Sequence, residues 1–359
     1  MDVLWGDETL FRNEEVFDPD YQPPAIFHRD SQIRDLAAFL RPAVRGRSPG
    51  HALCVGPPST GKTTVVRHVL EKVSKHDVAV AYLRCPILRT TYNVFARIYE
   101  IACERLPPQK GVPLFKLLSE VSASLDGPIV VALDDVDFLD TRVLNETLLT
   151  LSKNAEFCVG VIAISTSKQF LARVDPYLGS ILHFHEIGFP MYTREEIWRI
   201  LHWRVVNGFY PGAVTREAFE RVVEIVSRSG DVRYGLHLLR SAGIYAERRA
   251  SRRVELCDVE RAREGQESIM LAKSLSALNS DEREALRIIY SLEGDVTTGE
   301  VFAIMRSEVG LCYERFYEIV EKLERLRFID LVFGRKGRGR TRYVIKRLER
   351  DAVLRALTS

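Results

Sequence analysis

The feature that most constrains this chain is the glycine-rich segment Gly56-Pro57-Pro58-Ser59-Thr60-Gly61-Lys62-Thr63. It matches the phosphate-loop pattern G-x-x-x-x-G-K-[ST] at every fixed position. The apolar run 51–55 before it predicts a strand, and the run 64–70 after it predicts a helix. This is the context that the pattern requires, because the loop N–H groups and the helix N-terminus together attract phosphate. An ordinary glycine-rich turn, the alternative, fits these flanks less well.

The loop predicts a site for a nucleoside triphosphate and a magnesium ion. Lys62 is expected to bridge the terminal phosphates, and the Thr63 hydroxyl to hold Mg²⁺. The expected cofactors are therefore ATP or ADP and Mg²⁺. The loop residues expected to contact the nucleotide are Gly56, Pro57, Pro58, Ser59, Thr60, Gly61, Lys62, Thr63 and Thr64.

A second element of the same site lies downstream. The apolar run 129–133 predicts a strand, and it ends in the acidic pair Asp134-Asp135. We expect Asp134 to orient Mg²⁺ or its water ligands, and Asp135 to polarise the attacking water. Acids at the end of a strand also often cap the following turn, so the pair alone favours neither interpretation. Its position after a phosphate loop favours the metal site.

The composition is that of a globular protein with two or three domains. The chain has 359 residues, of which 46% are hydrophobic and 28% charged. It has no apolar run near the ~18 residues that a membrane span needs, and its acidic start lacks the order of a signal peptide. Six scattered cysteines without a C-x-x-C pair predict buried thiols in a reducing compartment. The sequence therefore predicts a cytoplasmic protein without a membrane partner.

Hydrophobic periodicity divides the chain into three regions. Up to about residue 190, short apolar runs alternate with helical patterns, which predicts an α/β fold with a parallel sheet between helices. From about 191 to 270 the spacing is helical throughout. The expected domains are 1–190, in which residues 1–25 wrap the surface of the sheet domain, a helical domain 191–275 and a C-terminal domain 276–359. The expected strands of the sheet are 52–55, 78–83, 129–133, 158–165 and 181–186.

The C-terminal region has the pattern of a winged helix. Three helical patterns over 280–292, 298–308 and 312–326 precede two apolar runs at 328–333 and 342–345. Between the runs, glycine alternates with positive residues, which suits close approach to a DNA backbone. The residues expected to contact DNA are Arg335, Lys336, Arg338, Arg340 and Arg342 of the hairpin and Tyr313 and Arg315 of the third helix.

Three points argue against a simple DNA assignment. A basic hairpin can serve solubility alone, although its place after three helices favours a wing. On the third helix, Glu314, Glu318 and Glu321 dilute the positive field that would face the major groove. The net charge of +2 is too small to argue for a nucleic-acid partner by itself.

A series of short segments, taken in order, resembles one known family. The segments are 27–33, 56–64, 133–137, 162–166, 174–176, 189–196, 230–233 and 337–341. From Ala25 to the C-terminus the chain is similar to the archaeal origin-recognition and cell-division-control initiator proteins, which belong to the AAA+ ATPases. The resemblance implies an AAA+ parallel-sheet nucleotide-binding domain, an all-helical lid and a C-terminal winged-helix DNA-binding domain.

The resemblance also implies roles for further residues. Arg233 aligns with the lid residue that reaches the γ-phosphate, although a surface arginine on a helix is the alternative. Arg29 and Tyr192 align with positions around the adenine, but a helix cap and a packed tyrosine explain them equally well. Thr166 aligns with the family's sensor asparagine. A helical segment near 89–111 would add a DNA contact from the ATPase domain.

Three positions depart from the family pattern. Asp135 stands where the family usually has glutamate, Thr166 where it has asparagine, and Tyr177 where it has an arginine finger for a neighbouring subunit. A carboxylate set back by one methylene aligns water less well, and tyrosine cannot replace the charge of the finger. We therefore expect tight nucleotide binding with slow ATP hydrolysis, which would act as a switch.

The sequence thus predicts an ATP-binding DNA replication initiator that binds duplex DNA at a replication origin through its winged helix and AAA+ domain. The resemblance implies an MCM-type replicative helicase and a paralogous initiator as partners. One alternative is an AAA+ ATPase of another class, clamp-loader-like or defence, whose winged helix binds protein. Another is a diverged paralogue that only regulates origin binding.

Overall fold

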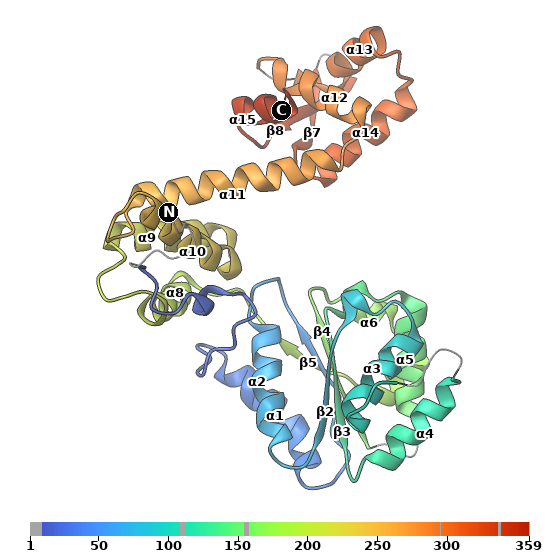
Figure 1. Ribbon diagram of the computed structural model, residues 1–359. Helices are drawn as coiled ribbons and strands as arrows, with labels where there is room; N and C mark the ends of the chain where they lie inside the picture. The colour runs from blue at the N-terminus through green and yellow to red at the C-terminus, as the bar shows by residue number, and fades with distance from the viewer. Residues whose placement is uncertain (1–8, 108–111, 154–157, 295, 337–338, 359) are drawn as a thin grey trace. The chain divides into compact units, whose positions relative to one another are not determined.

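The computed structural model describes residues 9–107, 112–153, 158–294, 296–336 and 339–358. The chain forms two compact units, with the division between Val259 and Glu260 (Figure 1). This division lies within the predicted helical domain 191–275, whose limits stay a prediction. No helix among the described residues is long and apolar enough to cross a membrane.

The first unit is built on a five-stranded parallel sheet. Its order is β2-β3-β4-β1-β5, so the strand before the phosphate loop lies inside the sheet. β3 and β4 are buried along their whole length, as strands covered on both faces must be. The strands are β1 (Ala52–Val55), β2 (Ala79–Arg84), β3 (Ile129–Asp134), β4 (Val159–Ser165) and β5 (His185–Gly188).

The predicted strand 181–186 is wrong in its first half. Helix α7 (Pro176–Leu182) occupies these positions, and β5 begins only at His185. The Asp175 side chain accepts a hydrogen bond from the Tyr177 N–H, and a proline stands at the first helical position. This cap starts a helix that continues through the apolar residues at 181 and 182. The other four predicted strands are confirmed, with ends shifted by no more than a residue.

Helices cover both faces of the sheet (Figure 1). In β1, Ala52 and Cys54 belong to one core and Leu53 and Val55 to the other, which follows from the two-residue period of a strand. The helices over the first core are α1 (Asp30–Val44) and α2 (Lys62–Ser74). Those over the second are α3 (Thr91–Cys103), α4 (Leu114–Ser124), α5 (Thr141–Lys153), α6 (Phe170–Arg173) and α7.

Three helices after the sheet form the lid. Thr193 starts the first of them with a capping box, because its hydroxyl accepts from the Glu196 N–H while the Glu196 carboxylate accepts from the Thr193 N–H. Gly230, with a φ of +70°, ends the second, and Asp231 caps the third. The helices are α8 (Arg194–Gly208), α9 (Arg216–Ser229) and α10 (Val232–Arg248), and α11 (Leu256–Ser276) follows them.

Part of the N-terminal extension belongs to the core of the lid. Phe17, in the 3-10 turn η1 (Glu14–Phe17), is 1% exposed, and its ring centre lies 4.9 Å from that of Phe209. The Phe11 ring stacks on Phe209 at 4.8 Å. Gly208 permits this packing, because a Cβ there would overlap the Phe17 ring.

The second unit combines helices with a three-stranded antiparallel sheet of order β6-β8-β7. The third predicted helix is confirmed as α14, in which Phe316, Ile319, Val320 and Leu323 form a buried stripe. A final helix, α15, was not predicted. The elements are α12 (Ser280–Ser291), β6 (Val296–Thr297), α13 (Thr298–Glu308), α14 (Tyr313–Arg325), β7 (Ile329–Lys336), β8 (Gly339–Lys346) and α15 (Arg350–Thr358).

The β7–β8 hairpin is longer than the sequence predicted. The expected tip at 334–341 is mostly strand, because the register continues to the pair Lys336–Gly339. Gly334 serves packing rather than a turn: a Cβ there would overlap the ring of Tyr343, which lies over it. Arg338, which was predicted to contact DNA, lies outside the described residues.

We predict that Phe17→Ala destabilises the first unit by about 3–5 kcal/mol, the usual cost of removing a buried phenylalanine ring. The ring packs against both Phe11 and Phe209, so its loss leaves a cavity in the lid. Thermal unfolding followed by circular dichroism measures the change, with Phe138→Ala as the control because Phe138 is 71% exposed. Equal midpoints for the two variants would contradict this packing.

Candidate nucleotide site

The phosphate loop joins the end of β1 to the start of α2. Gly61 has a φ of +84° and Ser59 a φ of +60°, both in the left-handed region that favours glycine. A Cβ at Gly56 would overlap the carbonyl oxygen of Phe189, and one at Gly61 would lie 2.5 Å from the Tyr192 hydroxyl oxygen. The loop therefore needs both glycines because segment 189–192 approaches it so closely.

Arg29 ties the loop to the same segment. It is 2% exposed and donates hydrogen bonds to the carbonyl oxygens of Thr60, at 3.0 Å, and Pro190, at 2.7 Å. Its guanidinium also lies 3.8 Å from the centre of the Tyr192 ring. Both residues were expected near the adenine; Tyr192 lines the cavity described below, whereas Arg29 is engaged with the loop backbone and is not among the lining residues.

Lys62 is the buried cation of the loop. It is 6% exposed, and Nζ donates to the carbonyl oxygens of Gly56 and Pro57, both at 2.7 Å. Burial, and then the nearby charge of Arg233, lowers the pKa of Lys62. An anion between two cations that repel each other relieves this repulsion. The arrangement therefore fits a phosphate chain.

Asp134 and Thr63 come together as expected for magnesium ligands. Thr63 Oγ1 lies 3.1 Å from each carboxylate oxygen of Asp134. The Tyr82 hydroxyl of β2 donates another hydrogen bond to Asp134 and so fixes the carboxylate. Burial, and then this bond, raises the pKa of Tyr82, which keeps its proton in place. Hydroxyl and carboxylate oxygens are the hard ligands that suit Mg²⁺, so these residues fit the ion.

Asp135 and Thr166 line the same cavity. Burial, and then the charge of Asp134, raises the pKa of Asp135. The Thr166 N–H and hydroxyl both donate to Asp137, at 2.7 and 2.9 Å. Because the hydroxyl has one proton, Thr166 has only acceptor capacity left for a ligand, whereas an asparagine side chain would also offer N–H donors.

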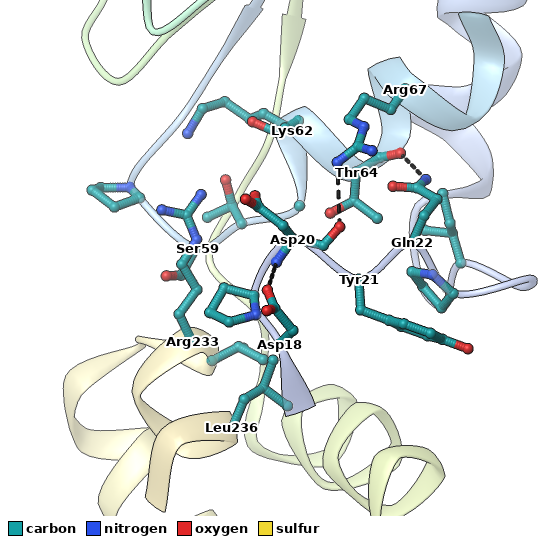
Figure 2. A pocket seen from close by; sticks show the side chains of 18 of the residues that line it. Asp18, Asp20, Tyr21, Gln22, Ser59, Lys62, Thr64, Arg67, Arg233 and Leu236 are labelled. Carbon is teal, nitrogen blue, oxygen red and sulfur yellow. Dashed lines mark hydrogen bonds between the residues drawn. The ribbon is translucent and has the colours of Figure 1, made fainter. Parts of the chain in front are cut away.

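The lid is bonded directly to the phosphate loop. The Ser59 hydroxyl donates a hydrogen bond to Asp231, which also accepts from the N–H groups of Arg233 and Tyr234 as the cap of α10. The helix that carries Arg233 is thus held at its first turn by the loop. Figure 2 shows Ser59, Lys62 and Arg233 around one cavity.

The cavity has a volume of about 540 Å³, which is in the range of small-molecule sites. Gly56 and Pro57, two of the predicted contacts, shape the loop but are not among its lining residues. The predicted residues that do line it are Pro58, Ser59, Thr60, Gly61, Lys62, Thr63, Thr64, Asp134, Asp135, Thr166, Tyr192 and Arg233.

Part of the cavity wall was not predicted from the sequence. The extension supplies residues 18–23 and 25–27, where Gln22 donates to the Thr64 carbonyl oxygen at 2.8 Å (Figure 2). Asp20 forms an ion pair with Arg84 of β2 at 2.7 Å. α8 adds Trp203 and Arg204, among others. These contacts join distant parts of the chain, so no local pattern signals them.

In the second unit, Arg342 joins the hairpin to α14. Its guanidinium lies 4.9 Å from the centre of the Tyr317 ring and 4.8 Å from that of the Phe333 ring. A guanidinium between two rings keeps its charge and loses much of its conformational freedom.

The other residues predicted to contact DNA lie in different environments. Arg315 donates to Glu318 at 2.6 Å, so a neighbouring acid offsets its charge. Tyr313 is 63% exposed at the start of α14. The side chains of Arg335, Lys336 and Arg340 lie outside the described residues, although their backbones are paired in β7 and β8.

Comparison with known proteins defines the class. Residues 25–164 match the family model of the AAA ATPase domain, and residues 198–264 match that of the Cdc6 AAA+ ATPase-type lid domain. ORC1-type DNA replication protein 2 of Archaeoglobus fulgidus is 43% identical over 359 residues, which cover 99% of this chain and 95% of the relative. ORC1-type DNA replication protein 2 of Methanothermobacter thermautotrophicus is 37% identical, with 99% and 96% covered.

Solved structures agree with this class. The Aeropyrum pernix Orc1 protein, solved in complex with DNA, matches with a TM-score of 0.78 and 30% identity over 98% of both chains. The chain therefore has the architecture of an AAA+ protein with a Cdc6-type lid and a C-terminal winged helix, as predicted. It belongs to the archaeal ORC1-type (Orc1/Cdc6) DNA replication proteins. This confirms the predicted family and sets aside an AAA+ ATPase of another class.

We predict that Ser59→Ala destabilises the first unit by about 1–3 kcal/mol, because it removes a hydrogen bond to a carboxylate. Ser59→Gly removes the same hydrogen bond, but glycine adopts a positive φ without strain. We therefore expect this variant to lose about 1 kcal/mol less stability than Ser59→Ala. Urea unfolding measures both, with the exposed Ser74→Ala as the control. If alanine and glycine lose equal stability, the loop conformation carries no strain.

Proposed function

We propose that this chain is an ATP-dependent initiator that binds duplex DNA at a replication origin. One observation carries the proposal: Lys62 of the loop and Arg233 of the lid line one cavity, where burial and then the charge of Arg233 lower the pKa of Lys62. A ligand that satisfies both cations must contact the base and the lid together. Its binding therefore affects how the two are held, which is the requirement for a nucleotide switch.

Different residues of the cavity would bind the phosphates and the Mg²⁺ ion of MgATP. The loop N–H groups and Lys62 would hold the phosphates, and Thr63 with Asp134 would hold Mg²⁺ or its waters. When bound, ATP and Mg²⁺ supply a hydrolysable phosphate bond and the charge that polarises it. Tyr82 keeps the Asp134 carboxylate in place through its hydrogen bond. Arg233 projects from a helix whose first turn is bonded to the loop through Asp231.

Slow hydrolysis is part of the proposal. Asp135 has a shorter side chain than glutamate, and Thr166 gives its donors to Asp137. Tyr177 cannot supply the positive charge of an arginine finger, which is worth ~10³-fold or more where it operates. A steady-state turnover above ~1 s⁻¹ without a partner protein would contradict a slow switch.

DNA binding is proposed to centre on the hairpin. Five positive residues lie between positions 334 and 342, and Arg342 is held against α14 by Tyr317. Arg315 is paired with Glu318, so the hairpin would contribute more to phosphate attraction than α14. The 30% identical Aeropyrum pernix Orc1 protein was solved with DNA, which supports this partner. Helicase recruitment and a paralogous initiator follow from the family alone.

A second candidate is a diverged paralogue that binds origins and regulates another initiator without loading helicase. The changes at Asp135, Thr166 and Tyr177 favour it, since all three weaken hydrolysis while the binding residues are kept. Reconstitution of helicase loading with purified components separates the two candidates: a chain that binds origin DNA yet never supports loading is the regulator.

We predict that Lys62→Ala weakens MgATP and MgADP binding by at least about 100-fold, because it removes charge-assisted hydrogen bonds to phosphate. Calorimetry measures the affinity, and Lys72→Ala on the exposed face of α2 is the control. DNA binding by this variant should no longer respond to ATP. If the variant no longer retains nucleotide yet binds duplex DNA with the affinity and sequence preference of the parent, the proposed coupling between nucleotide and DNA does not exist.

We predict that Arg338→Ala with Arg340→Ala weakens DNA binding on all sequences and reduces the salt dependence. Each lost phosphate contact lowers the slope of log K against log salt by about 0.9 for duplex DNA. Fluorescence anisotropy over a salt series measures the slope, with Arg45→Ala in the first unit as the control. A double variant with the parent's slope and affinity would show that the hairpin is only a solvated surface.

A further inference from the structure

Arg204 of α8 is a buried cation without an acidic partner. It is 8% exposed, and its one described hydrogen bond is from Nη1 to the carbonyl oxygen of Val16. Among the ion pairs of the described residues, none includes Arg204. Burial lowers its pKa to about 10. A buried guanidinium of this kind is costly unless other groups compensate its charge.

Two aromatic rings compensate part of the charge. The guanidinium carbon lies 5.2 Å from the centre of the Tyr21 ring and 5.7 Å from that of the Trp203 ring. Both rings, like Arg204 itself, line the cavity. Attraction to ring faces is worth about 2 kcal/mol or more when desolvated, less than the cost of a bare buried charge. Guanidinium carries five N–H donors, so most of them remain for a ligand.

The surroundings of Arg204 suit a flat heterocycle. The cavity lining includes the apolar residues Ile26, Phe27, Ile200, Trp203 and Leu236. The Trp203 ring lies beside Arg204, and its centre is 6.2 Å from that of the Phe27 ring. The charge of Arg233 contributes to the lowered pKa of Lys62, whereas the pKa of Arg204 is lowered by burial. A ligand that contacts both the two cations Lys62 and Arg233 and these apolar residues has an anionic chain and a planar apolar ring with hydrogen-bond acceptors. A purine nucleotide has this composition.

We propose that Arg204 recognises the nucleobase by donating N–H groups to ring-nitrogen acceptors of the purine. The proposal rests on ATP binding at this site and deepens it. The guanidinium has donors and no acceptor, so it can pair with N3 or N7 of adenine but not with the N6 amino group. Arg204 would thus add affinity for the base that is independent of Lys62 and the phosphates.

Arg204 also donates a hydrogen bond to Val16 of the N-terminal extension, so a purely structural role must be distinguished from a contact with the base. If Arg204 only anchored the extension, its loss would disturb the whole cavity and weaken every ligand to the same extent. If it contacts the base, its loss weakens ligands that carry a base and leaves the affinity for the bare phosphate chain unchanged. Inorganic tripolyphosphate provides that comparison.

The experiment uses the full chain with Arg204→Met, which keeps a long apolar side chain. Calorimetry in the presence of Mg²⁺ compares ATP with inorganic tripolyphosphate. We expect ATP to bind about 10–100-fold more weakly and tripolyphosphate to bind as it does to the parent. Arg199→Met, at an exposed position of the same helix, should change neither affinity. Equal losses for ATP and tripolyphosphate would overturn the proposal.

Analogues test the contact on the unaltered protein, even if Arg204→Met fails to fold. The parent should bind either 3-deaza-ATP or 7-deaza-ATP at least about 10-fold more weakly than ATP, and the variant should not distinguish that analogue from ATP. If the parent binds both analogues as tightly as ATP, the proposed contact is wrong while ATP binding stands. If the parent binds neither ATP nor tripolyphosphate, the proposed function itself is wrong.

Discussion

The structure depends on the close contact between the phosphate loop and segment 189–192. A Cβ at Gly56 would overlap the Phe189 carbonyl oxygen, and Arg29 donates to carbonyl oxygens on both sides of the contact. The next residue after this segment, Thr193, caps the first lid helix. Because backbone packs directly on backbone here, the conformation of the loop and the start of the lid are fixed together. The nucleotide site therefore forms at the junction of base and lid, and neither part contains it alone.

Charge determines what this junction can bind. Lys62 and Arg233 are mutually unfavourable in the free cavity, and Arg204 is buried without an ion pair to any acid among the described residues. The acids of the site, Asp134 and Asp135, are placed for a cation, and burial together with their repulsion raises the pKa of Asp135. Both sets of like charges are relieved by one ligand that is anionic and carries a metal ion. MgATP, the proposed ligand, would satisfy both.

In the second unit, the base of the hairpin belongs to the core through Ile329 and Val344, whereas its outer part pairs only with itself through β7 and β8. The hairpin is tied to α14 by Arg342, which lies between Tyr317 and Phe333. This contact orders a basic element without neutralising its charge, since aromatic rings attract a guanidinium but carry no negative charge. On α14 itself Glu318 pairs with Arg315, which offsets the charge of that arginine.

The sequence by itself determined the loop, four strands of the sheet and the helix α14, because each rests on residues close together in the chain. The prediction failed at 181–186, where an apolar run is compatible with either a strand or a helix. Asp175 caps the start of α7, and this helix continues over the first residues of the run. Only the tertiary structure placed Arg29 behind the loop and Arg204 at the cavity. No sequence pattern predicts the hydrogen-bond partners of a buried arginine. Arg29 donates to Pro190, 161 residues away, and Arg204 donates to Val16, 188 residues away. Local sequence patterns determine helices and strands, whereas the burial of a charged side chain depends on which distant residues the fold packs around it.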